Sequence, residues 1–193
     1  LSHAALARFA DAPTAETLKY LTHESYAIAP PDLRMAILAA AVRGRLFPQQ
    51  TRDRLAITEL NRCRKELGRD EWSPPEGTLE EAPFELPASW CWVTVDSGAD
   101  SRLGKMLDVE KNRGEPHPYL RNTNVHWFRF ELDSIKTMLF DPSEVEEFRV
   151  RTGDVLICEG GHGIARAAVW EDSLPGMTFQ KALHRVRPLP CLD

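Results

Sequence analysis

Apolar residues recur at helical spacing along the first third of the chain. Thr14 can cap a helix over residues 14–26, and a second helix is predicted over residues 33–45, where an apolar stripe ends at a glycine. In residues 53–69, apolar positions recur at three- and four-residue steps, opposite charged positions spaced for ion pairs. We therefore predict a helical arm over residues 1–69.

The pattern changes after this arm. Residues 70–88 are acidic and repeatedly interrupted by proline, so they cannot hold a long helix and are predicted to form a linker. Trp90–Val95 is aromatic and β-branched, which is typical of a strand. A short helix is expected at residues 142–147. Further strands are predicted around residues 119–120, 127–132, 154–158, 167–170 and 178–186. The predicted fold class is α+β, in which the helical arm precedes a compact strand-rich domain at residues 89–193.

Composition fits a folded protein and narrows its class. Apolar residues make up 42% of the 193 residues and charged residues 27%, while the net charge of −5 excludes a uniformly basic nucleic-acid-binding domain. Basic residues nevertheless cluster locally, with six against three acidic ones over residues 102–129. The longest apolar run, Met35–Val42, is too short to span a bilayer, and no secretory signal begins the sequence. A cytoplasmic protein without a membrane partner is expected.

A basic, glycine-punctuated loop follows residue 101. Arg102, Lys105, Lys111 and Arg113 lie within it and are candidates for contacts to a phosphate backbone. The alternative is a solvated surface loop, because charge runs usually mark solvent.

Three polar side chains follow the predicted strand at residues 119–120. Arg121, Asn122 and Asn124 suit direct base readout, since arginine pairs with guanine and asparagine with adenine. The alternative is an Asx-turn that the asparagines close.

Glycines surround His162 in the turn between two predicted strands. The turn is not a dinucleotide-binding motif, because Arg166 occupies the place of its third glycine and a strand, not a helix, follows. A tight turn that brings backbone close to a partner is expected, with His162 either a turn residue or a contact.

A last polar group lies on the predicted strand over residues 178–186. Alternation puts Gln180 and His184 on one face, where buried or interface hydrogen bonding is expected. Lys181 and Arg185 then lie on the other face, where they are candidates for phosphate contacts.

The motifs of catalysis are missing. Asp154 and Glu159 have a spacing roughly suited to a metal-dependent nuclease, but Gly160-Gly161 occupies the position of its lysine. No Walker A sequence is present, and the four cysteines lack the CxxC spacing of a zinc site. We expect no catalytic residue, metal or cofactor.

Five blocks in order resemble the specificity (S) subunit of type I restriction-modification systems, in its N-terminal part with one target recognition domain. The helix at residues 34–46 ends in Gly-Arg-Leu, similar to the family's "GKL" or "GRL" ending. The other similar blocks are Pro83–Val93, which resembles the start of a recognition domain, Tyr119–Asn124, Gly153–Trp170 and Phe179–Pro188.

This resemblance implies a non-catalytic subunit that recognises double-stranded DNA. In the family, two recognition domains each read half of a bipartite target, and long helices space them and dock the methylation (M) subunits. A separate restriction (R) subunit is the motor and nuclease, and the partner binds S-adenosylmethionine. His162 and Arg166, in the glycine-dense turn, are also candidate DNA contacts. The resemblance also implies that the recognition domain here is truncated, because the long helix expected after it is missing.

Two other functions remain open from the residues alone. One is a stand-alone DNA-modifying enzyme, either a nuclease or a methyltransferase without familiar motifs. The other is a purely structural protein-docking module built on the helical arm.

Overall fold

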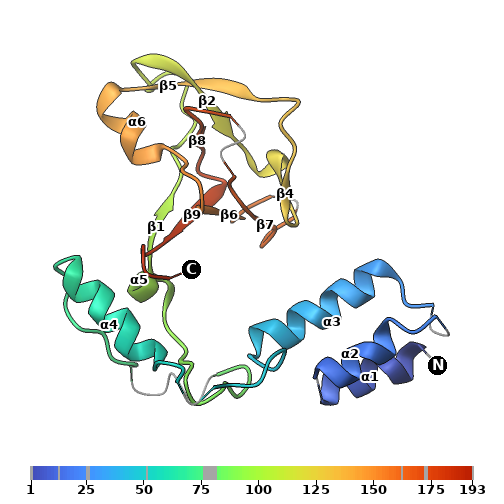
Figure 1. The fold of residues 1–193 in the computed structure, drawn as a ribbon. Helices are drawn as coiled ribbons and strands as arrows, with labels where there is room; N and C mark the ends of the chain where they lie inside the picture. Colours follow the sequence, from blue (N-terminus) through green and yellow to red (C-terminus); the bar gives the residue numbers. More distant parts are fainter. Residues whose placement is uncertain are drawn as a thin grey trace. The chain divides into compact units, whose positions relative to one another are not determined.

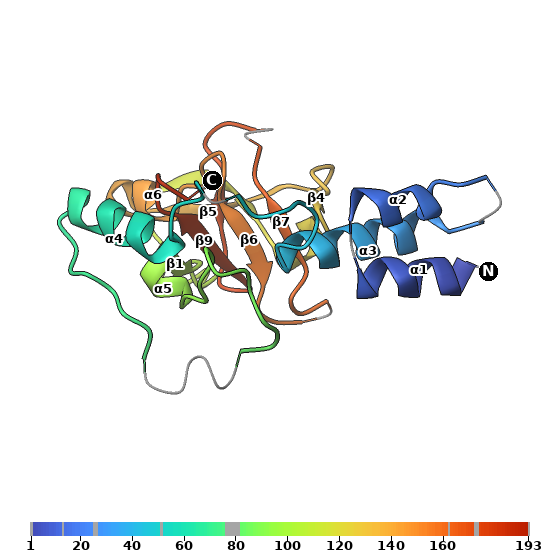
Figure 2. The ribbon, with the colours of Figure 1, turned by 60° about the horizontal axis from the view of Figure 1, so that its bottom comes forward.

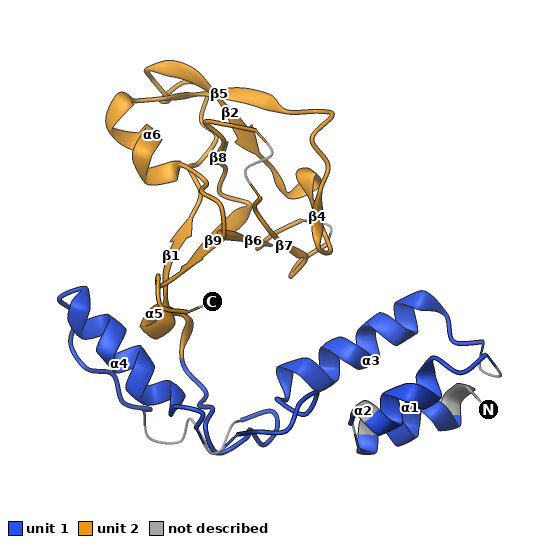
Figure 3. Ribbon diagram, in the orientation of Figure 1, with its two compact units in different colours: residues 1–93 blue, residues 94–193 orange. Residues whose placement is uncertain are grey.

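The chain folds into two compact units, which divide it near its middle. The computed structural model describes residues 2–12, 14–24, 27–50, 52–75, 82–161, 163–171 and 174–192. The units are Leu1–Val93 and Thr94–Asp193 (Figure 3). Helices occur together with antiparallel and mixed sheets, so the predicted α+β class is confirmed.

The first unit contains four helices among its described residues (Figure 1). They are α1 (Ser2–Asp11), α2 (Ala15–Leu21), α3 (Pro30–Val42) and α4 (Ala56–Glu66). Thr14 caps α2 as predicted, because its hydroxyl accepts a hydrogen bond from the Thr17 amide. Phe9, Leu21 and Ala40 bring α1, α2 and α3 into one small core. None of the described helices is long and apolar enough to cross a membrane.

The charged face of α4 forms the ion pairs that its spacing predicts. Arg62 pairs with Glu59 at 2.9 Å and with Glu66 at 2.7 Å, while Leu60 on the opposite face is buried. The pairs are solvent-exposed, so water and salt screen them and they contribute little to stability. Burial of the apolar face therefore contributes more to the stability of this helix.

The strand predicted over Trp90–Val95 is wrong. Residues 90–94 have no regular secondary structure, and the short helix α5 (Val95–Gly98) follows them. The Trp92 indole instead donates a hydrogen bond to the Phe84 carbonyl at 3.2 Å and packs edge-on against its ring. Aromatic residues favour strands only where a neighbouring strand pairs with them, and side-chain packing takes that place here.

The second unit contains a four-stranded antiparallel sheet (Figure 2). Its strands are β1 (Ala99–Leu103), β6 (Val155–Cys158), β7 (Ala167–Val169) and β9 (Leu183–Pro188), in the order β1-β9-β6-β7. The sequence predicted β6 and β7 within a residue of their bounds. It missed β1, because Ala-Asp-Ser-Arg-Leu has no run of β-prone residues.

A second sheet has the order β5-β2-β8, from Lys136–Phe140, Glu115–Leu120 and Thr178–Phe179. Its central strand β2 contains Pro116 and Pro118, which lack the amide hydrogen that a ladder needs. Alternation directs both proline nitrogens to the same edge of the strand. Along that edge, β8 pairs only with Tyr119 and Leu120, so the prolines cost no ladder bond.

Two predicted strands are divided by turns. The strand predicted over residues 127–132 is a hairpin of β3 (Val125–His126) and β4 (Arg129–Phe130), with a two-residue turn between them. The strand predicted over residues 178–186 breaks at Lys181 and Ala182, between β8 and β9. The face assignment that regular alternation gave to Gln180 and His184 therefore does not hold.

A single core joins the four-stranded and three-stranded sheets of the second unit to α6 (Pro142–Phe148), the short helix that the acidic residues predicted. Asp141 caps this helix, and its side chain accepts a hydrogen bond from the Ser143 amide at 3.1 Å. Trp170 is fully buried and meets the Phe130 ring edge-on at 5.0 Å. This core fixes the turns that carry the candidate site.

Candidate nucleic-acid interface

Segments far apart in the sequence meet on one face of the second unit. The Asn122 side-chain amide donates a hydrogen bond to the Gly160 carbonyl at 3.2 Å. Arg166 donates to the Asn122 carbonyl at 3.3 Å, and the Gln180 amide donates to the Leu120 carbonyl at 3.1 Å. We call this set of five residues the convergent face: Asn122, Gly160, Arg166, Gln180 and Lys181.

A shallow pocket of about 370 Å³ opens on the convergent face. Its lining surface is mainly apolar, but it also includes the oppositely charged Glu159 and Lys181. The chain can approach Gln180 closely at this pocket because residue 104 is a glycine. A Cβ at Gly104 would lie 2.2 Å from the Gln180 carbonyl oxygen. Across this close approach, the Lys181 amide donates a hydrogen bond to the Lys105 carbonyl at 2.9 Å, and the Lys105 amide donates to the Phe179 carbonyl at 3.2 Å. The end of β1 thereby positions Lys181.

Asn124 is completely buried, and both ends of its amide are engaged inside the protein. Its Oδ1 accepts a hydrogen bond from the Arg121 amide at 2.9 Å, and its Nδ2 donates to the Glu131 carbonyl at 2.9 Å. This geometry is not the Asx-turn, because the amide that Asn124 accepts from lies three residues earlier in the chain; Asn124 instead caps the short 3₁₀ helix Asn122–Asn124. We therefore do not propose Asn124 as a base contact.

Three of the predicted cations are held against the protein by α6 and its flanking chain. Arg102 pairs with Glu147 and lies over the Phe148 ring. Lys105 is buried, pairs with Glu144 and lies over the Phe140 ring, so the expectation that it projects from a surface loop is wrong.

Arg185 is the third of these cations and is also buried. Its guanidinium donates to the carbonyls of Glu147 and Arg149 at 3.1 and 3.0 Å, and burial lowers its pKa. A buried arginine bound to carbonyl oxygens does not reach a phosphate backbone. We therefore remove Arg185, with Lys105, from the proposed phosphate contacts.

Other predicted cations remain accessible. The Lys111 side chain is 84% exposed and has Asp108 at 3.6 Å, and Arg113 is exposed beside the Asn112 carbonyl. Lys181 is exposed as well, whereas Arg121 turns toward Ser134, with its guanidinium 2.6 Å from the Ser134 carbonyl. The exposed cations are the ones available to a charged partner.

The remaining predicted residues have mixed positions. His184 is half-buried within β9, where it pairs with Leu103 of β1 and Ile157 of β6. His162 lies outside the described residues, as do residues 76–81 of the predicted linker.

Asp154 belongs to a buried ion pair that the sequence did not predict. Its carboxylate is completely buried and binds the Arg187 guanidinium through two bonds of 2.6 and 2.8 Å, while the Arg151 amide donates to it at 2.7 Å. The pKa of Arg187 is raised in return, since the carboxylate stabilises its charge. With Asp154 occupied in this way, its spacing from Glu159 does not make a metal site. In the described part of the chain, no three histidine, cysteine or acidic residues gather in a way that would hold a metal ion.

Sequence reasoning also missed the exposed Trp127 and Phe128 at the β3–β4 turn and the mostly exposed Arg129 beside them. A useful signal was present, because two consecutive aromatic residues interrupt a strand-like pattern at the turn. Buried strands alternate in side-chain direction, so adjacent aromatic residues cannot both face one core.

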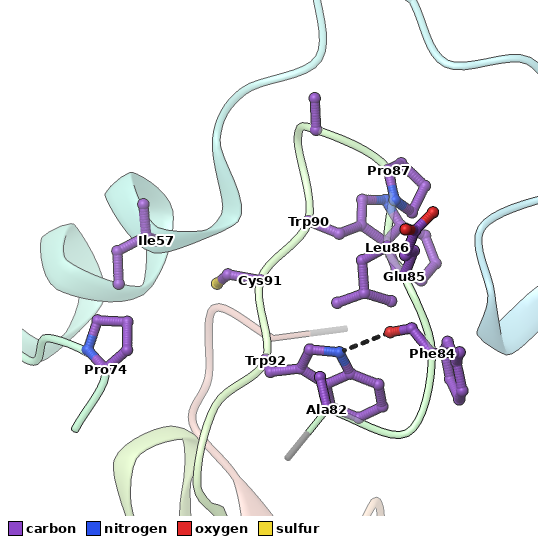
Figure 4. Close-up of a pocket in the computed structure, with 11 residues that line it drawn as sticks. Ile57, Pro74, Ala82, Phe84, Glu85, Leu86, Pro87, Trp90, Cys91 and Trp92 are labelled. Atoms are coloured by element: carbon purple, nitrogen blue, oxygen red, sulfur yellow. Dashed lines mark hydrogen bonds between the residues drawn. The ribbon is translucent and has the colours of Figure 1, made fainter. Parts of the chain in front are cut away.

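A larger apolar pocket of about 790 Å³ lies in the first unit (Figure 4). Of the eleven described residues that line it, Glu85 alone is charged. Burial raises the pKa of the Cys91 thiol in its wall, which disfavours the reactive thiolate. The lining is apolar and does not bring catalytic groups together.

Comparison with known proteins shows a similarity over part of the chain. The chain is 35% identical over 91 residues to the EcoAI type I restriction enzyme specificity subunit of Escherichia coli. The match covers 43% of this chain and 15% of that relative, so the chain corresponds to a small part of the longer protein. No family model matches the chain. Over part of its length, this protein is therefore similar to a type I specificity subunit.

Proposed function

We propose that this chain is a DNA-sequence-recognition subunit of a type I restriction-modification complex. The observation that carries the proposal is the convergent face, where polar residues from three distant segments gather at the surface. The similarity to a specificity subunit supports it. The chain is non-catalytic and cytoplasmic in this proposal, and it directs methylation and motor-nuclease subunits to a bipartite target.

Asn122 is the best-placed base contact on this face. It is half-buried, and one hydrogen of its Nδ2 is used by the Gly160 carbonyl. A side-chain amide has a second N–H and an acceptor oxygen, so it can meet an adenine edge without breaking that bond. Gly161 supports this position, because its φ of +77° suits glycine and a Cβ there would lie 2.5 Å from the Asn122 nitrogen.

Lys111 and Arg113 supply phosphate contacts in this proposal, and neutralising either changes the salt dependence of binding. Each alanine substitution is expected to weaken binding to all sequences and to flatten the slope of log K against log salt by about 1. The measurement is fluorescence anisotropy with a random-sequence duplex pool from about 50 to 200 mM salt. Lys65→Ala, at an exposed lysine of α4, is the matched control. An unchanged slope in both loop variants contradicts the proposed contacts.

An incubation with DNA distinguishes a recognition subunit from a stand-alone DNA-modifying enzyme. The full chain is mixed with duplex DNA, Mg²⁺ and S-adenosylmethionine, and cleavage and methyl transfer are both measured. Binding without either product is expected. Product formed by this chain alone favours an enzyme over a recognition subunit.

Exposed apolar side chains on α3 favour docking of the methylation subunits to the first unit. Met35, Leu38 and Val42 are exposed at helical spacing, so they lie on one face of the helix. A helix that exposes such a stripe commonly packs it against a partner. We assign this face to the methylation subunits, which the family places on helices of the specificity subunit.

Charging this stripe tests the docking role. Met35→Asp combined with Val42→Asp is expected to weaken capture of co-expressed methylation subunits by more than about tenfold, since loss of interface anchors typically costs ~2 kcal/mol or more. Binding of duplex DNA by the chain should not change. Lys19→Asp, at an exposed position of α2, controls for the added charge. Equal capture of the partner by the double variant and the control removes this assignment.

A further inference from the structure

The hairpin of β3 and β4 displays two aromatic rings at its turn. Trp127 is 56% exposed and Phe128 is 59% exposed, and together we call them the aromatic tip. Aromatic side chains of this size are usually mostly buried. Two adjacent exposed rings on a two-residue turn therefore indicate a surface that binds a partner.

The backbone of the aromatic tip is strained. Phe128 has a φ of +63°, in the left-handed region that residues with a Cβ rarely adopt. Its amide donates a hydrogen bond to the Ala167 carbonyl at 2.9 Å, and His126 pairs with Arg129 below the turn. Glycine would adopt this conformation without strain. A phenylalanine held there against its preference is typical of a functional position.

The hairpin beneath the tip is firmly anchored. Val125 is fully buried, and Phe130 packs edge-on against the buried Trp170 at 5.0 Å. The two tip rings lie 6.0 Å apart with planes tilted by 40°, so they are not stacked face to face on each other. A fixed aromatic ring with an exposed face loses little entropy when a planar group stacks on it.

The surroundings of the tip favour a nucleic acid. Ala167, which holds the tip, directly follows Arg166 of the convergent face. Arg129 adjoins the tip, and its side chain is mostly exposed, with Glu131 at 3.5 Å. Two rings on a narrow hairpin offer far less than the ~800 Å² per partner of a stable protein interface. Aromatic rings beside cations are the usual means of holding bases.

We propose that the aromatic tip is a stacking wedge, in which Trp127 or Phe128 lies against a base of the duplex bound by the convergent face. This inference rests on the proposed function, because it assigns the tip to the same DNA site. Proteins that insert such side chains open a base step and bend the duplex there. The tip would add affinity through stacking, which involves no exchange of counterions.

The test uses the full chain and duplexes that the wild-type chain enriches from a random-sequence pool. Trp127→Ala is expected to lower affinity roughly 5- to 150-fold, the range for loss of one stacked base. The slope of log K against log salt should stay as in wild type, unlike that of the Lys111 variant. Trp127→Phe should restore most of the affinity, because it returns a ring.

A second variant and a control keep the test independent of folding. Phe128→Gly removes a ring and relieves the strained φ, so the fold should be retained while affinity falls. Leu139→Ala removes an exposed apolar side chain from β5 and should bind as wild type does.

The outcomes separate this inference from the proposed function. If the wild-type chain enriches no duplex, both are overturned. If it binds with a steep salt dependence but both tip variants bind equally well, the wedge is overturned and the proposed function stands. The wedge also falls if the tip variants flatten the salt slope, or if they bind DNA normally but lose the methylation subunits.

Discussion

Asp154→Ala is expected to lower the free energy of unfolding of the second unit by about 3 kcal/mol, near the lower end of the range for breaking a buried ion pair. The carboxylate is completely buried, and its removal leaves the Arg187 guanidinium without the carboxylate, with its hydrogen bond to the Arg149 carbonyl at 3.1 Å still in place. It also leaves the Arg151 amide without an acceptor. The expected loss of stability lies near the lower end of that range because the Arg187 side chain is 23% exposed to water.

Hydrogen exchange of the full chain measures this effect where it occurs. Peptides from β6 and β9 should lose protection in the Asp154→Ala variant. Asp154 directly precedes β6, Arg187 lies within β9, and the two strands pair with each other. Glu171→Ala removes an exposed acid from the same unit and should leave protection unchanged. Added Mg²⁺ should not protect the wild-type chain further.

A paired replacement distinguishes an ion pair from a packing effect. Asp154→Leu combined with Arg187→Met removes both charges and should recover much of the lost stability, since apolar pairs often replace buried ion pairs without cost. Protection in Asp154→Ala equal to that of wild type means that the pair contributes nothing to stability.

The sequence predicted strands where one short segment carried the whole signal. Val155–Cys158 and Ala167–Val169 are compact apolar runs bounded by turn residues, and both are strands of the sheet. Strand β2 was largely hidden by its two prolines, whose tolerance depends on how little of β8 lies alongside. Trp90–Val95 had the composition of a strand but no strand to pair with. Pairing is a property of the whole fold, so local composition cannot supply it.

The candidate site was harder to predict than the fold for the same reason. Residue type drew attention to Asn122 and Arg166, which the fold brings together on the convergent face. Lys105 and Arg185 are held inside the protein by contacts to α6, which lies about forty residues from each of them in the sequence. A cation and a carboxylate or carbonyl partner that far apart in sequence carry no local signal of their contact. The two asparagines of one short segment also diverge, because only three-dimensional packing makes Asn124 buried and Asn122 accessible.

Asn124→Ala is expected to destabilise the second unit by about 2–4 kcal/mol without changing the DNA sequence that the chain prefers. Loss of the side chain leaves the Arg121 amide and the Glu131 carbonyl without their partners in the protein. Asn124→Asp should also destabilise, since it places a carboxylate against the Glu131 carbonyl oxygen. Asn122→Ala should show the reverse, with stability changed by less than about 1 kcal/mol and an altered base preference, because one weak hydrogen bond is lost at a half-exposed site.

Two measurements on each variant test this contrast. Hydrogen exchange of peptides covering residues 121–134 reports stability, and enrichment of duplexes from a random-sequence pool reports preference. The two substitutions remove the same chemical group two residues apart, so each is the matched control for the other. If Asn124→Ala keeps its protection and enriches a different sequence, then Asn124 reads a base and its role is not to cap the short 3₁₀ helix. If both variants enrich the wild-type sequence, base readout must lie elsewhere on the convergent face, and Gln180 becomes the next residue to substitute.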